Sequence, residues 1–150
     1  MGSSASSLDE GLMRCCIELA RQAKRAGNTA VGSLVAIDAR IVAEAEEETP
    51  GGPDRFAHAE LIAVRRATER LGRKTFPEAV LYTTAEPCLL CSFAIREARI
   101  ERIVIGTSVP HIGGATSPYP ILSAADVPPW GAPPTIVWGV LQKECEALRQ

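Results

Sequence analysis

The 150-residue sequence lacks a long apolar run and a charged-then-apolar leader. A membrane-spanning helix needs roughly 18–20 consecutive apolar residues, and a secretory signal pairs a charged segment with an apolar one. A strong charge of either sign is also missing, because 16 Lys and Arg stand against 18 Asp and Glu, a net charge of −2. Dedicated nucleic-acid binders usually carry a basic excess. We therefore expect a soluble cytoplasmic protein with no membrane partner and no nucleic-acid partner.

Histidine is scarce, with two residues, and cysteine occurs five times. An odd number of cysteines at these spacings does not suggest a disulfide framework. Cys15 and Cys16 are adjacent and fall on one apolar helix face, which is typical of core positions. Cys88 and Cys91, in contrast, form a Cys-x-x-Cys pair that calls for a chemical explanation.

With 46% hydrophobic residues the chain can form a core, and helical and strand patterns alternate along it. We expect a flexible tail over 1–7 and a single domain over 8–150, in which helices cover both faces of a sheet. The first helix is predicted from a capping box at Ser7–Glu10 to near Gly27. Further helices are expected at 57–72, 88–98 and 140–149, with a short one at 121–125, and strands at 33–37, 41–45, 79–83, 102–105 and 135–138.

Two short motifs lie at predicted helix starts, 30 positions apart: His58-Ala59-Glu60 and Pro87-Cys88-Leu89-Leu90-Cys91. A Cys-x-x-Cys at a helix N-terminus can aim both sulfurs at one point, where the positive end of the helix favours thiolates. Two sulfurs and one imidazole make three ligands for Zn²⁺, which leaves one position for water, as in catalytic zinc sites. Glu60 would reach that water without being a ligand and could carry protons to a substrate.

Other interpretations of the two motifs are weaker. A Cys-x-x-Cys alone could be a redox dithiol, and His-x-Glu alone is common by chance. A structural zinc site would need a fourth protein ligand, which the sequence does not supply near either motif. Together, the motifs match the His-x-Glu…Pro-Cys-x-x-Cys signature of zinc deaminases.

At these residues the chain resembles the cytidine-deaminase superfamily, in particular the branch of tRNA adenosine deaminases, guanine deaminases and fungal-type cytosine deaminases. The similarity extends to three other segments, Val31-Gly32, Thr83–Cys88 and Ala98–Ile100, and to the start of the last helix. It implies a three-layer α/β/α sandwich with a five-stranded mixed sheet, the cytidine deaminase-like fold, and a homodimer.

The resemblance also implies the chemistry. His58, Cys88 and Cys91 would bind one Zn²⁺ per chain, and Glu60 would be the catalytic proton shuttle. Hydroxide would attack the ring carbon that carries an exocyclic amine, and ammonia would leave. The Ala59 N–H would face the substrate.

The chain departs from this branch where a base-binding asparagine is usual, because an ungapped count back from His58 places Glu47 there. A gap of one would instead place Glu46 or Glu48 there. An ionised carboxylate only accepts hydrogen bonds, so Glu47 would select N–H donors or positive charge if it points inward. Alternatively, Glu47 belongs to a solvated acidic run with its neighbours. Asn28, Phe56 and His111 are further candidate substrate contacts, each of which could instead be an ordinary loop, core or surface residue.

These observations predict a zinc-dependent hydrolytic deaminase of a small amino-substituted heterocycle, a nucleobase or nucleoside. The basic, aromatic tail of the tRNA enzymes has no counterpart here, which disfavours a polynucleotide substrate. A tRNA adenosine deaminase and a catalytically inactive, zinc-stabilised binding module are the alternatives.

Overall fold

The N-terminal apolar periodicity forms α1 (Ser7–Arg25) in the computed structural model, which describes residues 5–150. Its capping box lies one residue earlier than predicted: the Ser6 side chain accepts the Asp9 N–H at 3.1 Å, and the Asp9 carboxylate accepts the Ser6 N–H at 3.0 Å. Asp9, rather than Glu10, therefore turns back to the cap. Of the predicted tail, residues 1–4 lie outside the described residues, whereas Ser6 and Ser7 already belong to the helix start.

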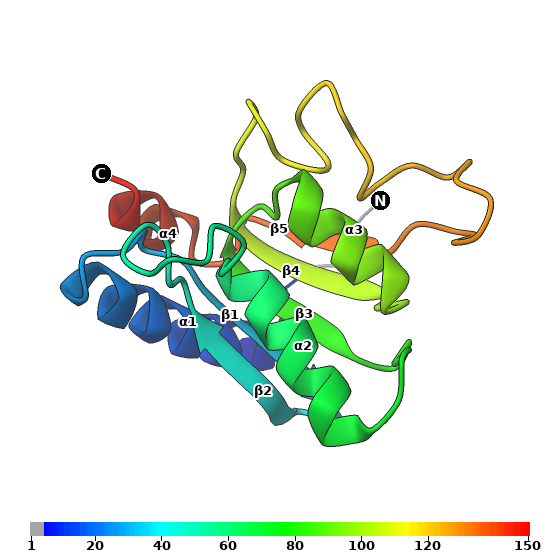
Figure 1. Cartoon of the computed structure of the whole chain (residues 1–150), viewed down its shortest axis with the longest axis horizontal. Helices are drawn as coiled ribbons and strands as arrows, with labels where there is room; N and C mark the ends of the chain where they lie inside the picture. The colour runs from blue at the N-terminus through cyan, green and yellow to red at the C-terminus, as the bar shows by residue number, and fades with distance from the viewer. Residues whose placement is uncertain (1–4) are drawn as a thin grey trace.

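A mixed five-stranded sheet in the order β2-β1-β3-β4-β5 forms the middle of the molecule (Figure 1). Its strands are β1 (Gly32–Ile37), β2 (Arg40–Glu46), β3 (Val80–Ala85), β4 (Arg102–Thr107) and β5 (Thr135–Trp138). β1 is antiparallel to both β2 and β3, while β3, β4 and β5 are parallel. The predicted hairpin and the predicted strand sequence are confirmed.

Helices cover both faces of this sheet, so the three-layer α/β/α fold is also confirmed (Figure 1). α2 (Ala59–Leu71) and α3 (Leu89–Glu97) pack on one face around Val35, Leu81 and Ile103. α1 and α4 (Gln142–Leu148) pack on the other face around Leu34, Tyr82 and Val104. Successive strand residues alternate between the two cores, as the pleat requires. No helix within residues 5–150 combines the length and apolar character needed to cross a bilayer.

The strand directions bring three loops to one edge of the sheet. β3 and β4 are parallel, so the segments that follow them, 86–88 and 108–117, leave from the same edge. β1 is antiparallel to β3 and therefore begins at that edge, where β2 ends with Gly32 paired to Glu46. Ligand sites in α/β sheets form at the carboxyl ends of parallel strands. The fold thus gathers both sequence motifs at one place.

The segment between β4 and β5 contains turns and no helix at 121–125, so that prediction is wrong. The buried Arg96 guanidinium donates to the carbonyls of Ile121 (2.9 Å), Leu122 (3.2 Å) and Ala124 (2.8 Å). Carbonyls turned toward Arg96 are not available to a helical hydrogen-bond ladder. Tertiary contacts to α3 therefore override the weak local helical preference.

Candidate active site

His58 and Cys88 occupy the N-cap positions of α2 and α3, and neither side chain caps its own helix. The His58 Nδ1 atom lies 3.4 Å from the Cys88 Sγ and 3.5 Å from the Cys91 Sγ. The three ligand atoms all lie within 4.8 Å of one another, although His58 is 30 positions from Cys88 in the sequence. Two helix N-termini therefore present three ligand atoms to one point.

These distances fit a zinc ion. Zn–S bonds of about 2.3 Å and Zn–N bonds of about 2.0–2.1 Å at tetrahedral angles place a nitrogen and a sulfur ligand about 3.6 Å apart. The observed separations of 3.4 and 3.5 Å agree with that value. The donor set of two sulfurs and one imidazole is also one that zinc prefers.

The electrostatics favour a thiolate at Cys88. A hydrogen bond from Cys91 lowers the pKa of Cys88 to about 5 against the effect of burial, and the His58 imidazole contributes in the same direction. The pKa of Cys91 is raised, first by the hydrogen bond it shares with Cys88 and then by burial. The first negative charge therefore forms at Cys88, and a divalent cation would draw off the second proton.

Glu60 is the second residue of α2 and is 5% exposed. Burial, together with the negative charges of Glu47 and Cys88, raises the pKa of its carboxyl group to about 8. A cation beside it would act in the opposite direction. A carboxyl group whose pKa can be moved across neutrality is suited to accept and donate protons.

Glu47 is buried and faces the start of α2, so it does not belong to a solvated acidic run. One of its carboxylate oxygens accepts the Ala59 N–H at 2.8 Å, and the other accepts the Thr49 hydroxyl. The Ala59 N–H, which was expected to face the substrate, is therefore bonded to Glu47. The structure places this pair directly beside Glu60.

The other candidate substrate contacts lie after α1, just before α2 and after β4, and their role in binding stays a prediction. The Asn28 amide oxygen accepts the Gly51 N–H at 2.8 Å, in a separate groove of about 250 Å³ that Lys24 and Arg149 also line. His111 is exposed on the loop after β4.

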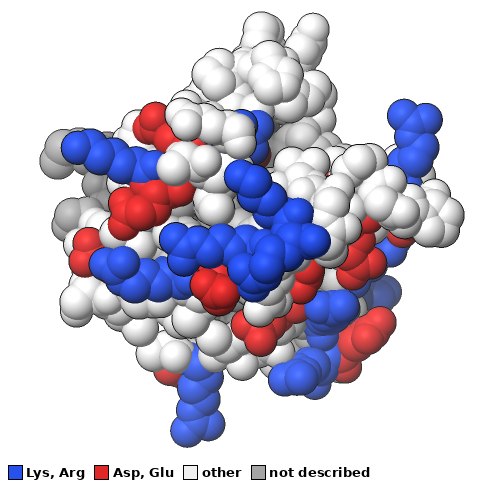
Figure 2. Space-filling view, turned by 90° about the vertical axis from the view of Figure 1, so that its left-hand side faces the viewer, with Lys and Arg blue, Asp and Glu red and all other residues white. Residues whose placement is uncertain are grey.

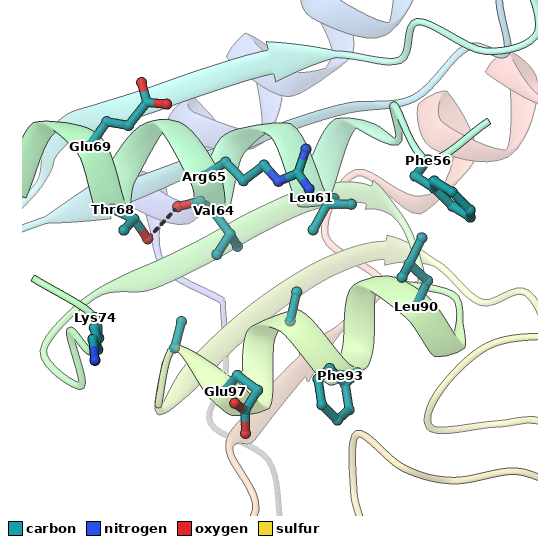
Figure 3. A pocket seen from close by; sticks show the side chains of 12 residues that line it. Phe56, Leu61, Val64, Arg65, Thr68, Glu69, Lys74, Leu90, Phe93 and Glu97 are labelled. Carbon is teal, nitrogen blue, oxygen red and sulfur yellow. Dashed lines mark hydrogen bonds between the residues drawn. The ribbon is translucent and has the colours of Figure 1, made fainter. Parts of the chain in front are cut away.

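Phe56 is 60% exposed and lines a groove of about 790 Å³ between α2 and α3 (Figure 3). In Figure 3 its ring lies at one end of the groove, beyond Leu61 on α2 and Leu90 on α3. His58, Cys88 and Cys91 do not line this groove. It is therefore distinct from the zinc-type cluster.

Sequence reasoning missed Glu86, a carboxylate that is only 4% exposed and precedes Pro87 and Cys88. It accepts hydrogen bonds from the backbone N–H groups of Val109, Ala115 and Thr116, each at 2.8 Å. Its signals in the sequence are a charged residue directly after an apolar strand and its place in the Thr83–Cys88 segment, which resembles the deaminase family.

Comparison with known proteins decides the family. Residues 6–107 match the cytidine and deoxycytidylate deaminase zinc-binding region, which is more than half of the chain. The chain belongs to this family. It is a hydrolytic deaminase with zinc as its cofactor, and the alternative of an inactive binding module is set aside.

Two similar proteins align with nearly the whole of this chain. The tRNA-specific adenosine deaminase of Agrobacterium fabrum is 34% identical over 139 residues, which are 92% of this chain and 90% of that protein. A solved structure from a study of A-to-I editing by tRNA:A34 deaminases at the wobble position superposes with a TM-score of 0.83 and 32% identity, covering 91% and 96% of the two chains. Guanine deaminase from Bacillus subtilis is similar over less, with a TM-score of 0.62, 31% identity, and coverage of 66% and 64%.

The expectation that nucleic acid is not a partner is wrong. It rested on the net charge and on the absence of a basic tail, but two relatives that match along nearly the full length of this chain are named for tRNA. Net charge sums over the whole surface, whereas binding depends on how charge is distributed over one face.

Proposed function

We propose that His58 Nδ1, Cys88 Sγ and Cys91 Sγ hold the zinc ion of this deaminase. The separations of 3.4 and 3.5 Å between nitrogen and sulfur support the assignment, as does the position of both motifs at helix N-termini. When bound there, zinc supplies a Lewis acid that activates water at neutral pH.

We propose that Glu60 moves the protons of the reaction. Its carboxylate would take a proton from the attacking water and deliver it to the ring nitrogen. It would then take the proton of the hydroxyl group formed on the ring carbon and pass it to the amine, which leaves as ammonia as the carbonyl forms. Burial at 5% exposure, in the first turn of α2, keeps the group fixed and largely free of bulk water.

We propose that the substrate is adenosine in tRNA, converted to inosine. The observation that carries this proposal is the 34% identity to a tRNA-specific adenosine deaminase over 90% of that protein's length. The surface charge is compatible with it: Figure 2 shows Lys and Arg side chains gathered across the middle of the face on the left-hand side of Figure 1. The last turn of α1 carries Lys24 and Arg25, and Lys24 shares a groove with Arg149.

Glu47 is proposed to contact the exocyclic amine of the base. A carboxylate offers about four acceptor sites, and Ala59 and Thr49 use one on each oxygen. The remaining sites can only accept, and the amine that leaves is an N–H donor. Glu47 would thereby orient the amine next to Glu60.

A second copy of the chain is the proposed occupant of the groove between α2 and α3. Phe56, Leu90 and Phe93 are exposed there by 60%, 37% and 50%, and contiguous apolar surface of this kind marks interaction sites. The rim carries Arg65 and Lys74 together with Glu69 and Glu97 (Figure 3). A copy related by a two-fold axis can set these opposite charges against each other.

Replacement of Glu60 by Gln tests the catalytic proposal and the substrate together. The side chain keeps its size but loses the ability to cycle protons, so we expect inosine formation in a tRNA transcript to fall by about 100-fold or more. Zinc content should stay at about one per chain, because Glu60 is not a ligand. Inosine is measured by nucleoside analysis, and zinc by atomic absorption.

The matched control is Glu48→Gln, a neighbouring exposed carboxylate, which should keep wild-type turnover. Near-wild-type activity of the Glu60→Gln enzyme would overturn the proton-transfer role. Turnover of free guanine, cytosine or adenosine by the wild type, with none on tRNA, would overturn the substrate and leave the chemistry standing.

A further inference from the structure

The Glu86 carboxylate, just after β3, binds the backbone of the loop that follows β4. Its oxygens accept the N–H groups of Val109, Ala115 and Thr116 at 2.8 Å, and the Thr116 hydroxyl at 2.5 Å. These donors lie 23 to 30 positions away in the sequence, and all of them point at one buried side chain. Hydrogen bonds to an ionised acceptor are about twice as strong as neutral ones.

The loop held by Glu86 contacts the zinc-type cluster from two sides. Gly113 forms a bridge with the Cys88 backbone, and the Gly114 N–H donates to the Pro87 carbonyl at 2.9 Å. Val109 packs in a buried cluster with Ala59, the residue between His58 and Glu60. The same carboxylate thus sets the position of loop atoms against both motifs.

The backbone of the loop at Gly113 and Gly114 packs tightly against the side chains of Glu86 and Ser92. A Cβ atom on Gly113 would lie 2.1 Å from the Glu86 carboxylate, and one on Gly114 would lie 2.0 Å from the Ser92 hydroxyl. Both distances are far shorter than van der Waals contact. At Gly113 the loop backbone therefore lies so close to Glu86 that a side chain there would require the carboxylate to move.

We propose that Glu86 is a positioning residue for the deaminase reaction: its carboxylate holds the 109–116 segment against Ala59 and Cys88 and so fixes one wall of the substrate site. The inference rests on the proposed site at His58, Cys88 and Cys91, and it is independent of whether the base belongs to an RNA. An amide in place of the carboxylate would put N–H donors against backbone N–H donors. The wall would then shift while the metal-ligating residues stay in place.

The test compares Glu86→Gln with wild type in the full-length, zinc-loaded protein. Hydrogen exchange at the amides of Val109, Ala115 and Thr116 should accelerate by about tenfold or more, because these amides lose their acceptor. The KM for the base that the wild type deaminates should rise by about tenfold, with a smaller change in kcat and about one zinc per chain. Glu86→Asp keeps the charge, so its KM should lie between that of Glu86→Gln and that of wild type.

Glu101→Gln, an exposed carboxylate just before β4, is the matched control and should change neither quantity. If Glu86 only stabilised the fold, the active fraction and Tm would fall while KM stayed within twofold of wild type, and that result would overturn the inference. Unchanged exchange at the three amides would overturn it too. Exchange needs no substrate, so it separates a failure of this inference from a failure of the proposed function.

If Glu86→Gln does not fold, Gly113→Ala probes the same contact from the loop side, with Gly11→Ala as its control because a Cβ there meets nothing within 4 Å. We expect the KM of Gly113→Ala to rise and the KM of Gly11→Ala to equal that of wild type. An unchanged KM in Gly113→Ala would overturn the role of the loop position.

Discussion

At Glu47, one carboxylate links the end of β2 to the start of α2. The backbone N–H of Glu47 donates to the Val31 carbonyl at 2.9 Å, which continues the pairing of β2 with β1. The side chain of Glu47 accepts the Ala59 N–H. An acceptor at a helix N-terminus satisfies a backbone donor that has no partner within the helix. The residue that is proposed to contact the substrate therefore also fixes the helix that carries Glu60.

Glu47→Gln is expected to weaken substrate binding more than it weakens the fold. The amide keeps one oxygen for Ala59 but turns its NH₂ group toward the hydroxyl of Thr49 or the substrate amine, so we expect KM to rise by about five- to tenfold. Steady-state ammonia release measures it, and Glu48→Gln is the control. A KM equal to that of the control would show that Glu47 serves the helix alone.

At the scale of the secondary-structure elements, an ion pair between the buried Asp9 and Arg102 holds α1 against the sheet. Asp9 is 1% exposed, and its carboxylate accepts two hydrogen bonds from the Arg102 guanidinium, at 3.0 and 2.8 Å, and one from the Tyr82 hydroxyl at 2.7 Å. Burial alone would raise the pKa of Asp9, but the hydrogen bonds from Arg102, Tyr82 and the Ser6 N–H outweigh it and lower the pKa to about 2. The same side chain completes the cap of α1, so one residue fixes both the start of the helix and its place on β3 and β4.

The lowered pKa predicts how stability depends on pH. An Asp whose pKa is depressed in the folded state stabilises the fold above its unfolded pKa of about 4, and this contribution is lost as the pH falls from about 4 to 2. We expect Asp9→Asn to be less stable than wild type by about 2–3 kcal/mol at pH 7, and the difference to shrink below pH 4. Urea denaturation at a series of pH values measures it.

Glu10→Gln is the control, because this exposed carboxylate lies in the same helical turn. Its stability should follow the wild type closely at every pH. A difference between wild type and Asp9→Asn that stays constant from pH 5 to pH 2 would contradict the depressed pKa.

At the scale of the whole molecule, the two faces of the sheet are covered unequally. α1 and α4 contact each other and close one face, whereas α2 and α3 leave the groove that contains Leu90 and Phe93. No residue of the segment 108–134 lines this groove, although the buried Trp130 packs edge-to-face with Phe93 at 5.4 Å and lies against Arg96. The apolar surface between α2 and α3 is thus left for a partner of matching shape.

Phe93→Glu is expected to convert a dimer of twice 16.0 kDa into a monomer. A charge in the centre of an apolar interface removes an aromatic anchor, so the dissociation constant should rise by about 100-fold. Light scattering after size exclusion, over a range of protein concentrations, measures it. Tyr119→Glu, a substitution at another exposed aromatic residue, should leave the mass unchanged, and a wild type that is monomeric at all concentrations would contradict the proposed dimer.

The sequence by itself determined the layer order and the chemistry of the site. Strand and helix periodicities are local, so the alternation of elements could be predicted. The first cap was misplaced by one residue within the same local capping pattern, and the error at residues 121–125 arises because Arg96 forms contacts that no local pattern reveals. The His-x-Glu and Cys-x-x-Cys motifs are local too. Their spacing already specifies the donor set and the helix starts on which His58 and Cys88 lie.

Only the tertiary structure showed that Glu47 and Glu86 are buried acceptors of backbone N–H groups. In the sequence Glu47 could be either a substrate contact or part of a solvated acidic run, and Glu86 is one residue of the Thr83–Cys88 segment. In the structure both are buried, and each accepts backbone N–H from a segment 12 to 30 positions away. Those partners meet because β1 runs antiparallel to β3 and β4 runs parallel to it, which brings the loop ends together at one edge of the sheet. A buried carboxylate is stable only where donors converge on it. That convergence depends on strand order and direction, which local sequence patterns do not encode.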